Sequence, residues 1–212
     1  MAPEGRKILF GLLLLSILCG IAAFCYEISV LKIFFYIFSI FFLFSLNFFR
    51  DPIRITPQGE NLLISPADGK VVLIKDVEDE SVGNAVQISI FLNVFNVHSN
   101  KMPIDGIVES VDYKKGKFKA AFDHSASDVN EQAIVVLSRG SIKIKIKQIA
   151  GLIARRIHCY AGVGSSVKPG ERFGFIMFGS RTDLIVPSNS VVNVKVGEKV
   201  KGGMTVLGQL TT

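Results

Sequence analysis

Two long apolar runs occupy the first fifty residues of the chain. The first, Ile8–Tyr26, is broken only by a few small and polar residues, and the second, Ile33–Phe49, is rich in phenylalanine. Each is about 17 to 20 residues long, close to the length that a helix needs to span a bilayer. The segment Glu27–Lys32 between them is too short for anything but a tight connection. The pattern predicts an apolar helical hairpin within residues 1–50.

From residue 51 onward the pattern changes to short β-branched segments separated by Gly, Asp, Ser and Asn, which is typical of strands. These segments are Val71–Lys75, Ala85–Leu92, Ile107–Tyr113, Ala133–Leu137 and Ile142–Ile149. In the last of them isoleucine and lysine alternate, which places one residue type on each face of a sheet. Only Gly151–Ile157 hints at a helical turn. We therefore expect a mostly β domain over residues 51–212.

One short pattern occurs twice near the C-terminus. Val167–Phe173 and Val194–Val200 share the order Val-Lys-x-Gly-Glu-basic-apolar, and each precedes glycine and an apolar segment. The pattern resembles the hairpins of lipoyl- and biotinyl-type carrier barrels, and two copies imply a barrel of paired hairpins. The alternative is that β-turns reuse glycine and charged residues without any common ancestry.

The charge is mildly basic, with a formal net value of +6. Aromatic and basic residues do not interleave, so the sequence favours an anionic membrane surface over nucleic acid as a partner. Basic residues flank the apolar pair on both sides: Arg6, Lys7, Arg50 and Arg54. The positive-inside rule then places both ends in the cytoplasm. A single span followed by an interfacial helix is the alternative, and it would move the domain to the opposite side.

Three cysteines, Cys19, Cys25 and Cys159, have no metal-like spacing, so we expect them to be reduced and buried. The densest basic cluster consists of Lys114, Lys115, Lys117 and Lys119. It is interpreted either as a solvated loop or as a contact for lipid headgroups.

The segment with the most specific chemistry is Gly170–Asp183, which contains Phe178-Gly179-Ser180-Arg181. Glycine leaves its carbonyl unshielded, and the serine hydroxyl is tethered beside it, so attack of Ser180 on Gly179 is intramolecular. A bare Gly-Ser pair is common and indicates nothing. The whole stretch, however, closely resembles the self-processing site of the short, membrane-bound form of phosphatidylserine decarboxylase, in which the serine becomes a pyruvoyl group.

Two further segments match that family. In Ser65–Gly69, the family aspartate of the self-cleavage machinery corresponds to Asp68. In Val94–Pro103, counting back from the proline places His98 at the first of two family histidines, whereas Lys101 occupies the position of the second, which is the usual base for serine activation. The resemblance therefore implies either that His98 serves both cleavage and decarboxylation or that cleavage uses a weaker base.

Other matching segments are Asn130-Glu131, Gln148–Gly151 and Ala154–Ile157. Arg155 and Arg156 are candidates to bind a substrate phosphate or carboxylate, with structural ion pairs as the alternative. His158 has no family counterpart and is interpreted as structural. The polar segment Phe118–Glu131, which contains His124, is expected to be a lid over a lipid headgroup or a surface loop.

The resemblance implies a pyruvoyl-dependent enzyme that converts phosphatidylserine to phosphatidylethanolamine. Such an enzyme is expected to need neither metal nor pyridoxal phosphate. We expect it to be bound to the cell membrane, with its catalytic domain on the cytoplasmic face. Cleavage would yield a large chain, residues 1–179, and a small chain, residues 180–212, which remain together as a heterodimer. An archaetidylserine decarboxylase and a non-catalytic lipoyl-like adaptor are the alternatives. A serine hydrolase is a further alternative, disfavoured because the Gly-x-Ser-x-Gly pattern is absent at Ser180.

Overall fold

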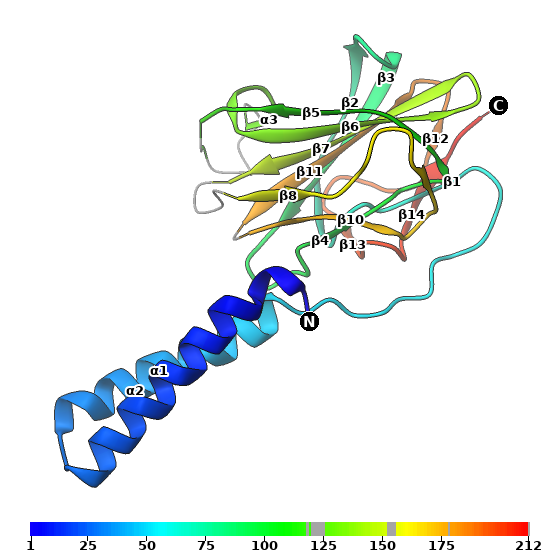
Figure 1. Cartoon of the computed structure of the whole chain (residues 1–212). Helices are drawn as coiled ribbons and strands as arrows, with labels where there is room; N and C mark the ends of the chain where they lie inside the picture. Colours follow the sequence, from blue (N-terminus) through cyan, green and yellow to red (C-terminus); the bar gives the residue numbers. More distant parts are fainter. Residues whose placement is uncertain (118, 120–125, 152–155, 178, 212) are drawn as a thin grey trace. The chain divides into compact units, whose positions relative to one another are not determined.

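The computed structural model describes residues 1–117, 119, 126–151, 156–177 and 179–211 of the chain. The chain divides into two compact units, Met1–Pro52 and Ile53–Thr212. The first unit is helical and the second consists mainly of strands (Figure 1).

The first unit is a pair of apolar helices whose contact is lined partly by small residues. The Oγ atoms of Ser16 and Ser39 hydrogen-bond at 2.7 Å, and the rings of Phe24 and Phe35 meet edge to face with centroids 5.8 Å apart. Because their hydroxyls bond to each other, the two serines place no unpaired polar group in the contact. The elements are η1 (Pro3–Gly5), α1 (Arg6–Cys25) and α2 (Ser29–Phe48).

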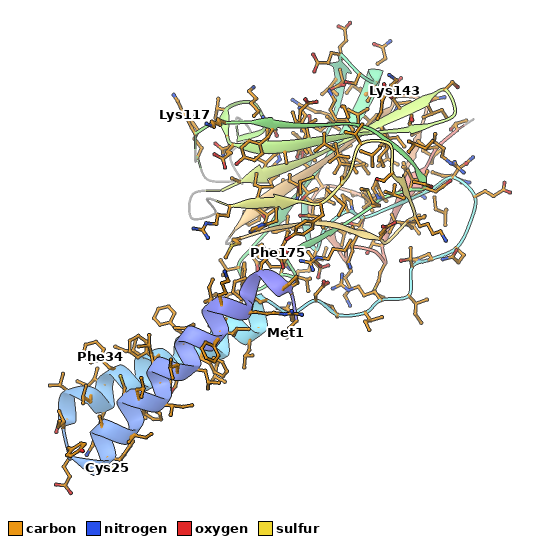
Figure 2. All side chains as sticks on the ribbon, viewed as in Figure 1. Met1, Cys25, Phe34, Lys117, Lys143 and Phe175 are labelled. Carbon is orange, nitrogen blue, oxygen red and sulfur yellow. The ribbon has the colours of Figure 1, made fainter. Side chains whose placement is uncertain are left out.

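Apolar side chains also cover much of the outside of this pair. Phe10, Leu43 and Ile40 are between 64% and 69% exposed, and Figure 2 shows Phe34 extending away from α2. Both helices are long and apolar enough to cross a membrane. The predicted helical hairpin is confirmed, and an outer surface of this kind suggests association with a membrane. The expectation of buried cysteines is wrong for Cys25, which is exposed at the end of α1, and Cys19 and Cys159 are only partly buried.

The second unit confirms the prediction of a mostly β domain. Its one helix among the described residues is the single turn α3 (Ala126–Val129). In the segment expected to form a helical turn, residues 152–155 lie outside the described residues and Ile157 begins a strand. The strands are β1 (Leu62–Ile64), β2 (Gly69–Asp79), β3 (Gly83–Leu92), β4 (Ser99–Lys101), β5 (Gly106–Lys114), β6 (Gln132–Arg139), β7 (Ile142–Ala150), β8 (Ile157–Cys159), β9 (Ser166–Val167), β10 (Arg172–Ile176), β11 (Ser180–Pro187), β12 (Val191–Val192), β13 (Lys199–Val200) and β14 (Val206–Gln209).

The main sheet has eight strands in the order β13-β2-β3-β11-β7-β6-β5-β9, and it curls as Figure 1 shows. Hairpins join β2 to β3, β5 to β6 and β6 to β7, while β11 is inserted between β3 and β7 from much later in the chain. The strand that begins at Ser180 is thus an interior strand with antiparallel partners on both sides.

Both faces of β11 are buried. Ser180, Thr182 and Leu184 share one face because side chains alternate along a strand, and Leu184 belongs to the main hydrophobic core. Arg181 and Asp183 share the other face and are equally inaccessible, with 0% exposure. Charged residues at such positions need internal partners.

Two three-stranded sheets, β4-β10-β8 and β1-β14-β12, complete the domain. The repeated sequence pattern forms the same turn in both copies. Gly170 and Gly197 have φ of +78° and +98°, and the side chains of Glu171 and Glu198 accept the backbone N–H of the lysine three residues earlier, at 3.0 and 3.1 Å. The two turns connect strands of different sheets.

Candidate active site

Ser180 lies opposite Leu92 of β3 and Ala150 of β7. It is fully buried, and within the described part of the chain its Oγ has no hydrogen-bond partner. A buried hydroxyl without a partner is costly and calls for an explanation. The preceding residue, Gly179, has φ +69°, and apart from its chain neighbours no heavy atom of the described residues lies within 4 Å of the position that a Cβ would take. The turn therefore holds an unpaired nucleophile beside an unshielded glycine.

His98 is the fully buried histidine that reaches this turn. Its Nδ1 lies 3.0 Å from the carbonyl oxygen of Asn96, which can only accept, so Nδ1 carries the proton. In that tautomer Nε2 is the acceptor, and it accepts the Gly179 N–H at 3.3 Å. The structure thus brings His98 to Gly179 with its basic nitrogen beside the Gly179–Ser180 pair. Such an imidazole can take a proton from a neighbouring hydroxyl.

A buried amide network lies on the same face as Ser180. The Asn100 amide nitrogen donates to Thr182 Oγ1 at 3.0 Å and to the Pro66 carbonyl at 3.5 Å, so its Oδ1 must face the other way. There Oδ1 accepts from Gln148 Nε2 at 2.9 Å. The orientation of Gln148 is fixed in turn, and its Oε1 is left buried with no donor among the described residues. A buried acceptor of this kind can receive an N–H from a bound molecule.

Sequence reasoning did not assign a role to Asn100 or Thr182. Asn100 lies in the same segment as His98, and Thr182 is two residues beyond Ser180, so both were close to residues already chosen. Their proximity to the site depends on the register of β11 and β7, in which Thr182 is paired with Gln148. A sequence pattern does not contain that pairing.

Asp68 is buried just before β2 but does not contact Ser180 or His98 within hydrogen-bond distance. Both of its carboxylate oxygens are taken by Arg54, with 2.9 Å between Nη2 and Oδ2, and Oδ1 also accepts the Gly202 N–H at 2.8 Å. Asp68 nevertheless lies at the same end of the main sheet, because β2 begins next to the end of β3 and the beginning of β11.

Arg181 and Asp183 form an ion pair on the face of β11 opposite to Ser180, with Nε 2.7 Å from Oδ1. Arg181 also donates to Ser89 Oγ at 2.5 Å, and the second oxygen of Asp183 accepts from Gln87 at 3.0 Å and Ser127 at 2.6 Å. Because all of these groups are buried, the pair fixes β11 against β3 directly after Ser180. Neither residue of this pair was predicted from the sequence to have a role.

The remaining residues singled out from the sequence give less support for a role at the site. Arg156 is exposed, and Arg155 and His124 lie outside the described residues. His158 stacks on Tyr160 with ring centroids 6.2 Å apart, which fits its structural interpretation, and its carbonyl oxygen lies 3.4 Å from Gln148 Nε2. Asn130 is structural as well, because its amide donates to the Ala150 carbonyl at 2.8 Å.

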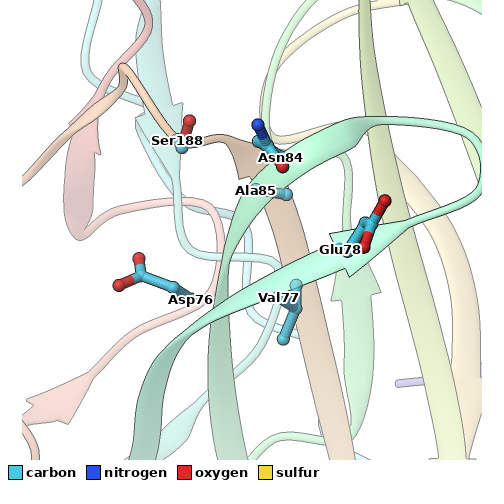
Figure 3. Close-up of a pocket in the computed structure, with 6 residues that line it drawn as sticks. All are labelled: Asp76, Val77, Glu78, Asn84, Ala85 and Ser188. Carbon is cyan, nitrogen blue, oxygen red and sulfur yellow. The ribbon is translucent and has the colours of Figure 1, made fainter.

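A separate hollow of about 410 Å³ is drawn in Figure 3. It lies between β2 and β3 at the end where Ala85 is paired with Pro187, the last residue of β11. That is seven residues along the strand from Ser180, or about 23 Å. Asp76 and Glu78 give it acidic walls, so it is poorly suited to an anionic substrate. Among the described residues no cluster of three His, Cys, Asp or Glu side chains is arranged to hold a metal.

Comparison with known proteins gives a consistent result. The family model described as phosphatidylserine decarboxylase matches residues 41–208. The chain is 45% identical over 197 residues to the phosphatidylserine decarboxylase proenzyme of Desulfotalea psychrophila, covering 90% of this chain and 92% of that one. It is 42% identical over 213 residues to the proenzyme of Cupriavidus metallidurans, with 99% and 95% covered. The proenzyme of Ralstonia nicotianae is 48% identical over 169 residues, 79% of each chain.

Proposed function

The chain belongs to the phosphatidylserine decarboxylase family of enzymes, and we propose that it acquires activity by cutting itself between Gly179 and Ser180. The cut would leave a pyruvoyl group at position 180, which then serves in the decarboxylation of phosphatidylserine to phosphatidylethanolamine. The observation that carries this proposal is the unpaired, buried Ser180 Oγ next to a glycine whose N–H is bonded to His98 Nε2.

Self-cleavage follows from the chemistry of this turn. His98 Nε2 takes the proton of Ser180 Oγ, which attacks the Gly179 carbonyl carbon and replaces the amide bond by an ester. Loss of the Ser180 α-proton then breaks the bond between the side-chain oxygen and Cβ, and the Gly179 carboxylate leaves. Addition of one water and loss of one ammonia convert the remaining end into the pyruvoyl group. The φ of +69° at Gly179 suits this step, because glycine adopts it without strain.

The residues around position 180 fit such a group. A pyruvoyl group supplies a carbonyl that binds the substrate amine and an electron sink for the bond that releases CO2. Gln148 Oε1, the buried acceptor on the same face, is suited to hold an N–H of that amine. His98 can return a proton to the carbon that loses the carboxylate. Asp68, bonded to Arg54 and Gly202, would hold this end of the sheet in place during the cleavage step.

The membrane pair gives the proposal its cellular setting. We place the catalytic domain on the cytoplasmic face of the cell membrane, because basic residues flank the helical pair and the segment Glu27–Lys32 between the two apolar runs carries one charge of each sign. Substrate and product are both lipids, so an anchored enzyme remains beside them. A reporter fused after Thr212 tests the orientation, and labelling of that reporter from outside the cytoplasm would contradict it.

The decisive experiment is intact-mass measurement of the purified wild-type chain and of Ser180→Ala. We expect the wild type as two chains divided after Gly179 and the variant as one uncut, inactive chain. Ser190→Ala is the matched control, because Ser190 Oγ is likewise buried without a partner among the described residues but lies between β11 and β12, beyond the end of β11 opposite to Ser180. A full-length, unmodified wild-type protein with decarboxylase activity would disprove self-cleavage.

A further inference from the structure

A second pocket, of about 380 Å³, lies where β2 begins, β3 ends and β13 passes alongside. We propose that it binds the phosphodiester of the lipid headgroup, an inference that rests on the proposed function. The residues that carry it are Lys70, Lys199, Lys201, Asn93, Asn96 and Asp68.

The three lysines make the pocket strongly cationic. None of them forms an ion pair with a described residue. Lys70 of β2 is paired directly with Lys199 of β13, so two like charges face each other across neighbouring strands. Such a pair is destabilising unless an anion lies between its members. A bound anion would relieve this repulsion.

The one carboxylate on the wall is already neutralised. Asp68 is paired with Arg54 through both oxygens and also accepts the Gly202 N–H at 2.8 Å. It therefore offers no free charge to the three lysines. The pocket keeps its positive character even though an acidic residue lines it.

The two asparagines contribute donors only. Asn93 Oδ1 accepts the Phe95 N–H at 2.9 Å, and Asn96 Oδ1 accepts the Asn93 N–H at 2.9 Å. With both oxygens used, each side chain presents its NH2 group. Three ammonium groups and two amides without a competing acceptor suit a ligand that only accepts hydrogen bonds, and a phosphodiester is such a ligand.

The pocket is close to the reaction site. Lys70 pairs with Phe91, and the next residue, Leu92, pairs with Ser180, so the two positions are separated by two strand spacings, about 10 Å. In phosphatidylserine four bonds of about 1.5 Å join the amine nitrogen to phosphorus, and a lysine side chain closes the rest of the gap. Lys70 and Ser180 lie on opposite faces of the sheet, so a ligand meets both around the strand ends. The Asn93–Asn96 turn lies there, and its Asn96 carbonyl orients His98.

Binding can be measured without turnover. Full-length Ser180→Ala protein in detergent is titrated with glycerophosphoserine and, separately, with inorganic phosphate, followed by 31P NMR. Adding Lys70→Gln and Lys199→Gln is expected to weaken glycerophosphoserine binding about tenfold or more, while Lys70→Arg with Lys199→Arg preserves it. Lys75→Gln with Lys168→Gln is the control, since it removes the same charge from exposed positions outside the pocket. Equal affinity in the pocket and control variants, or binding of inorganic phosphate alone, would overturn the proposal.

A second measurement separates the headgroup from the membrane surface. With cleaved enzyme and monomeric dihexanoyl-phosphatidylserine, the pocket variant is expected to show a raised KM although no bilayer is present. A defect confined to anionic vesicles would mean that the lysines bind the surface instead, and the headgroup site would be rejected. Because the titration uses the uncut Ser180→Ala chain, its result does not depend on whether the proposed self-cleavage occurs.

Discussion

At the scale of single residues, the feature that matters most is the fixed tautomer of His98. The Asn96 carbonyl holds the proton on Nδ1, so Nε2 is available to accept, and it is directed at the Gly179 N–H. Full burial keeps water from competing for this nitrogen. The imidazole therefore presents its unprotonated nitrogen to the Gly179–Ser180 pair, as the proposed self-cleavage requires.

We expect His98→Gln to fold but to cleave at least about a hundredfold more slowly than the wild type. The glutamine oxygen can still accept the Gly179 N–H, but an amide cannot take the serine proton. The measurement is the fraction of cut chain against time on a denaturing gel. His158→Gln is the control, because that ring stacks on Tyr160 and makes no hydrogen bond to Gly179 or Ser180 among the described residues. If His98→Gln is cut at the wild-type rate, His98 is not the base.

At the scale of elements, β11 is held by paired strands on both sides and by ion pairs that link the strands. One of these joins β7 to the β2–β3 hairpin, with Lys145 Nζ 2.7 Å from Asp79 Oδ1. Lys145 is only 3% exposed. Burial alone raises the pKa of Asp79, but hydrogen bonds from Lys145, Ser81 and Val82 outweigh it and hold that pKa below its ordinary value.

The lowered pKa of Asp79 has a definite consequence for stability. The stabilisation by Asp79 is fully present above the pKa of this residue in the unfolded chain, about 3.9. It is lost as the pH falls through the lower pKa of Asp79 in the folded protein. Asp79→Asn should therefore lower the melting temperature at pH 6. Between pH 6 and pH 3, the melting temperature of the variant should fall less than that of the wild type. Thermal unfolding of full-length Ser180→Ala protein with and without the change measures this. Asp76→Asn, at an exposed carboxylate of the same strand, should reproduce the wild-type pH dependence; the same dependence in Asp79→Asn would contradict the assignment.

Much of this element level could be predicted from sequence. Period-two alternation in Ile142–Lys147 placed Ile144 and Ile146 in the core, as observed, and the repeated turn has the same glycine and glutamate geometry in both copies. The alternation was misleading at one position. Lys145, on the face expected to be solvated, is buried because the β2–β3 hairpin covers it and supplies Asp79.

The candidate site was only partly accessible to the same reasoning. Gly179, Ser180 and His98 were chosen from a family resemblance, and the structure places them together. Asp68 was chosen in the same way, but it lies with Arg54 instead. The polar partners of Asn100 and Arg181 come from strands distant in sequence, so only the register of β3, β7 and β11 reveals them.

At the scale of the whole molecule, the proposed chemistry and the proposed membrane anchor lie in different units. The proposed catalytic residues Gly179, Ser180 and His98 all lie in the β unit, whereas both apolar helices lie within residues 1–52. The division suggests that the helices act on access to the lipid substrate and not on the reacting groups.

Deletion of residues 1–52 should therefore leave self-cleavage intact while turnover of phosphatidylserine in vesicles falls at least about tenfold, because the substrate stays in the bilayer. Turnover of monomeric dihexanoyl-phosphatidylserine should be largely retained. The ratio of the two activities, compared with full-length enzyme, is the measurement. A truncated chain that remains uncut, yet has the circular dichroism of a β protein, would show that the helices take part in cleavage.

The interior position of β11 would also make the proposed cleavage irreversible in practice. While the chain is continuous, the pairing of β11 with β3 and β7 is an intramolecular step. The entropic cost of closing the loop depends only weakly on the loop length. After the proposed cut, backbone hydrogen bonds on both edges keep residues 180–212 in place, but nothing covalent would guide them back after denaturation. Diluted from denaturant, the mature protein should fail to recover at concentrations where the uncut Ser180→Ala chain refolds. The lifetime of the mature protein would then be set by its rate of unfolding and no longer by the equilibrium between folded and unfolded states.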